Sequence, residues 1–149
     1  MHRSSSVPSL NVNVEFIDNP VCWVFIVMLF LIQRVVLAGI GLSARTAWTI
    51  VNYTHGIISY VTFHFPTGDP FLGDNCRDHL TFWEQIDDQM QFTQARKFLT
   101  ILPIVFFLIA VDAAEWEPKW FWSNFVICFI IVVAKLPFLH QVRIFGIGS

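Results

Sequence analysis

Four apolar segments, separated by polar connections, dominate the hydrophobic pattern of the chain. They run from Val21 to about Leu42, from about Thr46 to Phe65, from Phe98 to Val111 and from Trp120 to about Leu136. A helix needs about 20 apolar residues to cross a bilayer, so the first two segments are long enough and the last two are short. The connections at residues 41–45 and 112–119 are brief, and each therefore predicts an antiparallel helical hairpin. The predicted fold class is an all-α membrane protein whose four transmembrane helices form two hairpins.

The composition supports a lipid environment. Of the 149 residues, 55% are hydrophobic and 13% are charged, whereas soluble domains carry about 25% charged residues. Sixteen Phe and six Trp fit lipid-facing and interfacial positions. The net charge of −2 gives no basis for binding nucleic acid, so membrane lipid is expected around this chain and nucleic acid is not an expected partner.

The basic residues predict how the chain is oriented in the membrane. An even number of spans places both termini and the central polar connection on the same side. Six of the nine basic residues then lie on that side, namely Arg3, Arg77, Arg96, Lys97, Lys135 and Arg143. Because Lys and Arg near span ends favour the cytosol, this side is predicted to be cytosolic. The expected organisation is a cytosolic N-terminal segment at 1–20, a transmembrane domain at 21–138 with a cytosolic connection at about 66–97, and a cytosolic tail at 139–149.

The polar connection contains a predicted amphipathic helix. Thr81 and Glu84 have the spacing of a capping box, in which two side chains satisfy free backbone N–H groups at a helix start. One face of the helix is apolar and the other is acidic; the acidic face does not suit anionic lipid. It is either a solvated face of a helix packed on its own bundle or a docking surface for a basic partner. The candidate partner interface comprises Trp83, Glu84, Asp87 and Asp88.

Several polar side chains lie within the apolar segments. A stripe on the second segment comprises Asn52, His55, Gly56 and Ser59. Polar groups are costly in hydrocarbon, so the stripe is expected to face other helices and form interhelical hydrogen bonds. A contact with a lipid headgroup or a partner helix is the alternative. Near the end of the fourth segment, Lys135 is expected to extend toward the membrane interface.

The sequence contains no pattern that predicts catalysis. Its five histidines are not clustered as metal ligands, and nucleophile, phosphate-binding and HExxH motifs are absent. The adjacent Asp87 and Asp88 point in different directions around a helix and do not form an acid–base pair. We therefore predict no catalytic residue, no metal site and no cofactor of its own.

Four blocks of sequence resemble the ORMDL family of endoplasmic-reticulum membrane proteins. The blocks are WTIVN with His55, GDPF at 68–71, WEQIDDQMQFTQARKFLTILPIV from Trp83, and KLPFLHQVRIFGI from Lys135. The resemblance implies a non-catalytic subunit that inhibits serine palmitoyltransferase when ceramide is plentiful. The implied partners are the catalytic subunits of that enzyme, its small activating subunit and ceramide, and any pyridoxal phosphate would belong to the enzyme. A general membrane adaptor or assembly factor is the alternative function.

The resemblance also implies a ceramide-sensing position in the N-terminal segment. The family carries an Asn-x-Asn pattern before the first span, which Asn11-Val12-Asn13 matches, with Asn13 at the sensing position. An amide can both donate to and accept from the polar groups of ceramide. The implied ceramide-binding residues are therefore Asn13 and Asn11. The corresponding hypothesis is that ceramide orders this segment into a lid over the enzyme's substrate site.

Overall fold

The computed structural model of the protein describes residues 12–68, 79–139 and 142. Helices account for most of these residues, and an isolated β-bridge joins Thr67 to Thr81. In chain order the helices are α1 (Val12–Glu15), η1 (Phe16–Asp18), α2 (Pro20–Gly39), α3 (Ala44–Phe63), α4 (Phe82–Gln85), η3 (Ile86–Gln89), α5 (Gln94–Ala113), α6 (Pro118–Ala134) and η4 (Pro137–Leu139).

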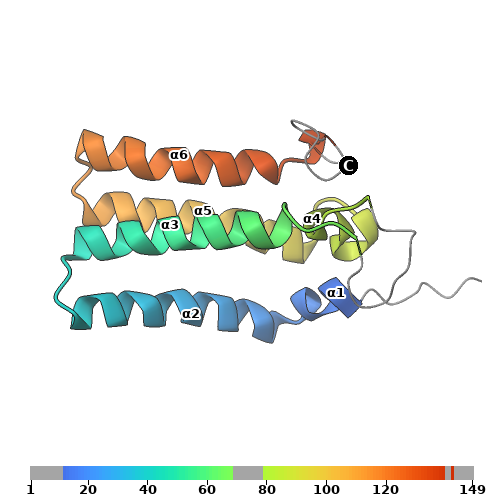
Figure 1. Cartoon of the computed structure of the whole chain (residues 1–149), viewed down its shortest axis with the longest axis horizontal. Coiled ribbons are helices and arrows are strands. Elements are labelled where there is room, and N and C mark those ends of the chain that lie inside the picture. Colours follow the sequence, from blue (N-terminus) through green and yellow to red (C-terminus); the bar gives the residue numbers. More distant parts are fainter. Residues whose placement is uncertain (1–11, 69–78, 140–141, 143–149) are drawn as a thin grey trace, which may run out of the picture.

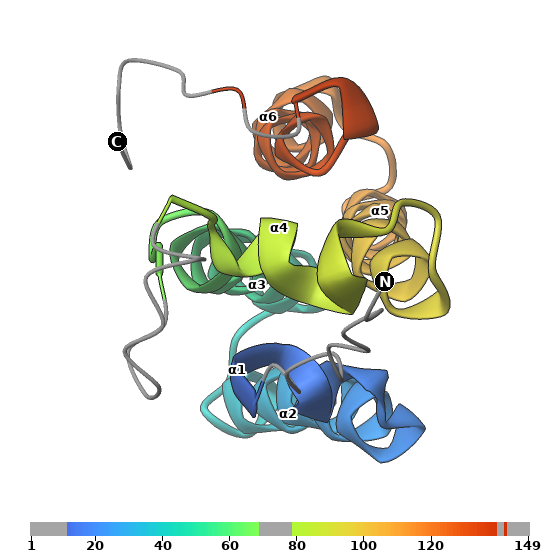
Figure 2. The ribbon, with the colours of Figure 1, turned by 90° about the vertical axis from the view of Figure 1, so that its right-hand side faces the viewer.

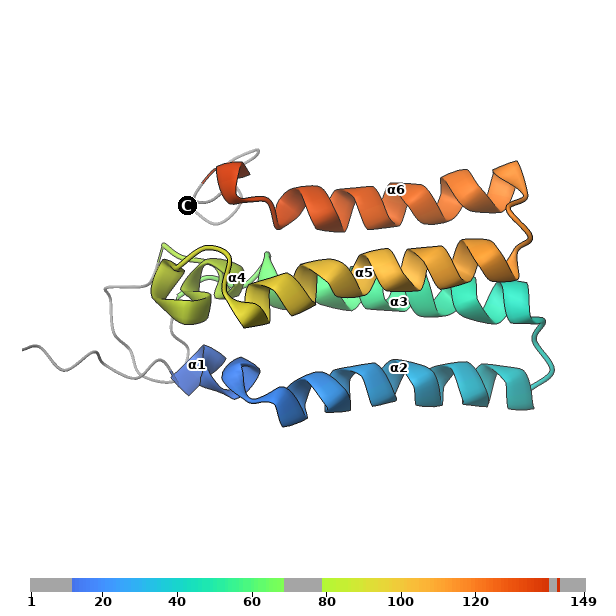
Figure 3. The same ribbon diagram turned by 180° about the vertical axis from the view of Figure 1, so that it is seen from behind.

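The four long helices lie side by side along the long axis of the molecule (Figure 1). Helices α3 and α5 occupy the middle, α2 packs against α3, and α6 packs against both α3 and α5 (Figure 3). Because α2–α3 and α5–α6 are antiparallel neighbours in sequence, the two predicted hairpins are confirmed. The short helices α1 and α4 lie at the end of the bundle opposite the two hairpin turns, and α4 crosses the ends of α3 and α5 (Figure 2).

Side-chain caps explain where three of the long helices begin. Asn19 Oδ1 accepts the N–H of Val21 at 2.9 Å, at the start of α2. Ser43 and Thr93 cap α3 and α5 in the same way through their hydroxyl groups. A cap satisfies an N–H group that has no partner inside the helix. Helix α5 therefore begins at Gln94, four residues before the predicted apolar segment.

A polar network joins α3 to α6 in the interior of the bundle. Asn52 Nδ2 donates to Asn124 Oδ1 at 2.9 Å, and Asn124 Nδ2 donates to Thr49 Oγ1 at 3.2 Å. Tyr53 on α3 also forms a hydrogen bond with the hydroxyl of Ser123 on α6. Both asparagines are completely or almost completely buried. The prediction that the polar stripe of α3 faces other helices is confirmed, since Asn52, His55, Gly56 and Ser59 are all buried. The expected interhelical hydrogen bonds form only in part: Asn52 is bonded across the interface, whereas Nδ1 of His55 and Oγ of Ser59 have no hydrogen-bond partner among the described residues.

The turn end of the bundle is fixed by an ion pair between the two hairpins. Arg45 at the start of α3 donates to Glu117 before α6 at 2.9 Å, and its guanidinium lies 6.0 Å from the ring centre of Trp120. Both ionic side chains are partly exposed, so solvent screening makes their contribution to stability small. The contact nevertheless brings together two residues far apart in sequence.

The outer surface of the bundle is apolar. Phe30 is the one buried residue of α2, whose exposed positions include Val21, Phe25, Ile32 and Val35. Among the described residues, α2 and α5 are long and apolar enough to cross a membrane by length and composition, and α6 is apolar but shorter. Exposed apolar area on this scale indicates an apolar environment or a partner surface.

The predicted amphipathic helix in the connection is interrupted. Helix α4 is a single turn and is followed by the 3-10 helix η3, and Asp87 and Gln89 have φ angles of 54° and 68°. The carbonyl groups of Glu84 and Ile86 accept hydrogen bonds from Arg96 instead of continuing a helical ladder. Tertiary contacts therefore override the helical periodicity, and the prediction of one continuous helix is wrong.

Gly56 provides a test of the α3–α6 contact. A Cβ atom at Gly56 would lie 2.4 Å from Cγ2 of Ile127, whereas one at Gly39 would meet nothing within 4 Å. Overpacking of this kind costs about 1–3 kcal/mol. We expect Gly56→Ala to lower the thermal unfolding temperature of the purified protein, and Ile127→Ala in the same chain to recover part of the loss.

Gly39→Ala is the matched control for this experiment and should leave the unfolding temperature unchanged or raise it, because Ala favours helix. Equal unfolding temperatures for Gly56→Ala and the original protein would contradict the close contact.

Candidate functional site

Trp83 lies at the centre of the bundle end that carries α1 and α4. Its side chain is 4% exposed, and its ring is flanked by two basic groups. The guanidinium carbon of Arg96 lies 5.1 Å from the ring centre and the ammonium of Lys135 lies 5.3 Å from it. Such cation–π contacts strengthen when they are removed from water. Phe63 at the end of α3 completes the aromatic surroundings, with ring centres 6.2 Å apart.

Arg96 connects α5 to the chain segment that carries Trp83. Its Nη2 donates to the backbone carbonyls of Glu84 and Ile86 at 3.3 and 3.2 Å, and its Nη1 donates to Oε1 of Gln91 at 3.2 Å. The residue is 4% exposed. Because the guanidinium is planar and presents its donors in a fixed fork, these contacts fix the position of the segment relative to α5.

Lys135 lies one residue beyond the end of α6 and is also buried. Its Nζ donates to the carbonyl of Leu99 on α5 at 2.7 Å and lies 5.6 Å from the ring centre of Phe63. The prediction that this side chain extends toward the membrane interface is wrong, because a carbonyl and two aromatic rings hold it inside the bundle. Burial lowers the pKa of the ammonium from 10.5 to about 7.

Side chains within the connection hold its own backbone. Thr81 and Glu84 form the predicted capping box: the Thr81 N–H donates to Glu84 Oε2 at 2.8 Å, and the Glu84 N–H donates to Thr81 Oγ1 at 3.4 Å. Gln85 is 1% exposed, and its Nε2 donates to the carbonyls of Gly68 and Leu80 at 2.7 and 3.1 Å. Gln85 therefore joins two parts of the connection, at Gly68 and at Leu80.

The N-terminal helices pack onto this same surface. Val14 of α1 and Ile17 of η1 are buried in one apolar cluster with Trp83, Ile86 and two residues of α5. Ile17 is 1% exposed, and its carbonyl accepts the indole N–H of Trp23 at 2.6 Å. The N-terminal segment from residue 12 is therefore docked against the end of the bundle through both apolar and polar contacts.

Comparisons with known proteins agree on one family. Residues 11–143 match the ORMDL family model. The chain belongs to the ORMDL family.

Named relatives are similar to this ORMDL protein over most of its length. The chain is 39% identical over 135 residues to Protein ORM1 of Saccharomyces pastorianus, which covers 89% of this chain and 91% of that protein. It is 38% identical over 137 residues to Protein ORM1 of Saccharomyces cerevisiae, covering 90% of this chain and 62% of the relative. It is 35% identical over 143 residues to human ORM1-like protein 2, covering 94% of each chain.

Of the predicted site residues of this ORMDL protein, those that the structure describes lie at the end of the bundle that carries α1 and α4. Asn13 lies in α1, directly before the buried Val14, and Asn11 lies outside the described residues. Trp83 and Glu84 are buried within the chain, so neither is presented to solvent. Asp87 is half-buried, and Asp88 lies in η3. Their role as a partner interface stays a prediction.

Three residues of the site have no counterpart among the predicted site residues: Gln85, Arg96 and Lys135. From the sequence, Arg96 is a marker of membrane orientation and Lys135 is expected to reach the membrane interface, since a basic residue beside an apolar segment ordinarily reaches water. Their position next to apolar segments was nevertheless a signal from which their burial could have been predicted. The burial of Gln85 depends on the two carbonyls brought together by the connection, which no local pattern indicates.

Arg96→Ala tests whether this guanidinium holds the connection in place. The substitution leaves the carbonyls of Glu84 and Ile86 without their partner, and each buried unpaired group costs about 1–3 kcal/mol. We expect faster hydrogen–deuterium exchange of backbone amides at 82–89, measured by mass spectrometry. Lys97→Ala, which changes an exposed neighbour, is the control. Unchanged exchange in Arg96→Ala would show that the connection is held by other contacts.

Proposed function

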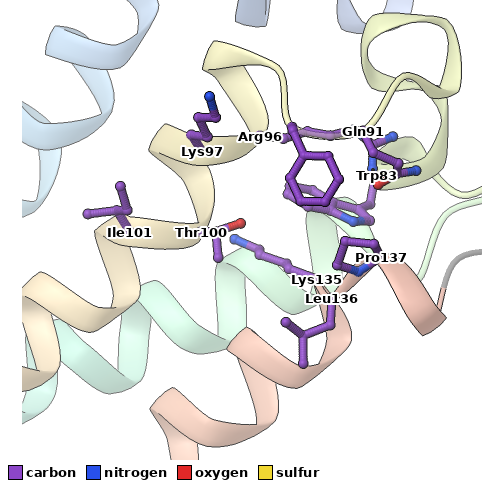
Figure 4. Close-up of a pocket in the computed structure, with 10 residues that line it drawn as sticks. Trp83, Gln91, Arg96, Lys97, Thr100, Ile101, Lys135, Leu136 and Pro137 are labelled. Carbon is purple, nitrogen blue, oxygen red and sulfur yellow. Dashed lines mark hydrogen bonds between the residues drawn. The ribbon is translucent and has the colours of Figure 1, made fainter.

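We propose that this protein is a four-helix membrane protein of the endoplasmic reticulum, with α2, α3, α5 and α6 as its spans and both termini in the cytosol. The apolar outer surface of the bundle supports this arrangement, and α2 and α5 are long and apolar enough to cross a membrane. The charges at its two ends support the orientation. Arg96, Lys97 and Lys135 lie together near Trp83 and α4 (Figure 4), whereas the turn end has Lys119 and an Arg45 that is paired with Glu117.

Within this membrane arrangement, we propose that the protein is a non-catalytic regulatory subunit that inhibits serine palmitoyltransferase in response to ceramide. Membership of the ORMDL family supports the assignment. The observation that carries the proposal is the docking of the N-terminal segment on the cytosolic end of the bundle. In the proposed orientation Asn13 lies at the membrane boundary, where the polar part of a ceramide lies.

The proposed action of ceramide is on the equilibrium between docked and undocked forms of the N-terminal segment. Val14 and Ile17 anchor the segment against Trp83 and Ile86, and Asn13 immediately precedes this anchor. Holding a short segment in one conformation costs about 1–2 kcal/mol of backbone entropy per residue. A ceramide that binds only the docked form shifts the equilibrium toward it by the difference in affinity between the two forms. The docked segment then blocks the substrate site of the enzyme.

Co-purification and enzyme activity together test the proposed function. The tagged full chain, recovered from gently solubilised membranes, should bring serine palmitoyltransferase with it in a fixed ratio. Activity of the reconstituted enzyme should fall with added ceramide in the presence of this chain and respond less in its absence. Recovery of unrelated membrane proteins without the enzyme would instead favour a general adaptor or assembly factor. Enzymatic turnover by the purified chain alone would contradict a non-catalytic role.

Asn13→Ala tests the sensing position. The substitution removes an amide that can donate to and accept from ceramide, and loss of such hydrogen bonds costs about 0.5–1.5 kcal/mol each. We expect the reconstituted complex to need a several-fold higher ceramide concentration for half-inhibition, with its activity in the absence of ceramide unchanged. Glu15→Gln alters an exposed side chain on the same helix and serves as the control. An unchanged ceramide response in Asn13→Ala would exclude Asn13 as the sensor.

A further inference from the structure

A cavity opens between α5 and α6 at the end of the bundle that carries Trp83. Its volume is about 240 Å³, and its lining comes from the start of α5, the residues just beyond α6 and the connection. Figure 4 shows Lys135 extending from the end of α6 toward Thr100 of α5, with Trp83 beside them.

The surface of the cavity is mainly apolar, and the charged side chains among its lining residues are all basic. Arg96 and Lys135 contribute two buried basic groups, and the exposed Lys97 is the third. Among the described residues that line the cavity, none is acidic. Glu84 and Asp87 act favourably on the charge of Arg96, but neither is a lining residue.

The two buried cations are incompletely compensated. The hydrogen bonds of Arg96 and Lys135 go to neutral acceptors, namely backbone carbonyls and the Gln91 amide. The Nε of Arg96 is buried and has no hydrogen-bond partner among the described residues. Burying a charge is costly unless an opposite charge and hydrogen bonds compensate for the lost water. Two such cations beside one cavity therefore favour an anionic ligand.

Apolar side chains from α5 and from the residues beyond α6 also line the cavity. They include Ile101, Leu136 and Pro137, and Ile101 lies one turn further along α5 than Lys97 (Figure 4). A ligand that fits the whole lining has an anionic group near Arg96 and Lys135 and an apolar portion directed along α5 and α6. A free anion would leave the apolar lining uncovered. Ceramide carries no charge and would leave the cations uncompensated.

We propose that this cavity binds the phosphate headgroup of an anionic membrane lipid in the cytosolic leaflet. Lys135 and Arg96 hold the phosphate, and the lipid chains lie along α5 and α6. Phosphate oxygens are strong acceptors for ammonium and guanidinium donors. The proposal rests on the membrane orientation described under Proposed function. It does not depend on serine palmitoyltransferase, so the two can fail separately.

Native mass spectrometry of the purified full chain tests the proposal. Bound lipid is counted after titration of the detergent-solubilised protein with dioleoyl phosphatidic acid and, separately, with dioleoyl phosphatidylcholine. We expect tighter binding of phosphatidic acid. Lys135→Met should weaken that binding roughly tenfold or more, as for loss of a charge-assisted hydrogen bond. Lys119→Met removes an exposed ammonium at the opposite end of the bundle and should leave it unchanged.

A second variant distinguishes loss of the binding site from a folding defect in Lys135→Met. Thr100→Phe keeps both cations and fills the cavity, and it should weaken binding of phosphatidic acid as well. Equal binding by Lys135→Met and Lys119→Met would overturn the proposal, as would equal binding of the two lipids. If inorganic phosphate displaces phosphatidic acid from the original protein, the site recognises free phosphate and the lipid assignment is wrong.

Discussion

The burial of Trp83 beside two basic groups is the interaction on which the end of the bundle that carries α1 and α4 depends. The indole ring is the meeting point of α3, α5, the residue after α6 and the N-terminal helices. A Trp side chain buries a large apolar area, and its ring attracts cations. Arg96 and Lys135 both lie close to the ring, and their donors also satisfy carbonyls of α5 and the connection. Removing the ring would disturb every one of these contacts.

This arrangement relates the N-terminal segment to the rest of the bundle. Val14 and Ile17 pack on the apolar cluster that contains Trp83, and the cavity between α5 and α6 is lined by the same residue. A ligand at either place therefore acts on a shared set of contacts. In the proposed function, ceramide stabilises the docked segment, and an anionic lipid in the cavity stabilises the cations beneath it. Coupling between the two ligands would be reciprocal.

Periodicity and short connections were sufficient to predict the helices and hairpins, because long apolar segments joined by brief turns have few other arrangements. The capping box at Thr81 and the buried stripe at Asn52 were also predictable, since each depends on local spacing. The contacts at the end of the bundle that carries α1 and α4 were not predictable from the sequence. Arg96 diverts the carbonyls of the connection from a helix, and Lys135 is held inside by a carbonyl of α5. Both depend on residues distant in sequence, which a local pattern does not contain.

The central claim is that docking of the N-terminal segment on the Trp83 surface controls inhibition. Ile17→Ala tests it directly, because it weakens docking at a residue that is 1% exposed and leaves Asn13 in place. Ceramide dose–response curves of reconstituted serine palmitoyltransferase should be compared for Ile17→Ala and for Phe16→Ala, whose parent side chain is 54% exposed. The account predicts that Ile17→Ala shifts half-inhibition to a higher ceramide concentration and that Phe16→Ala does not. Identical curves for Ile17→Ala and the original protein would contradict it.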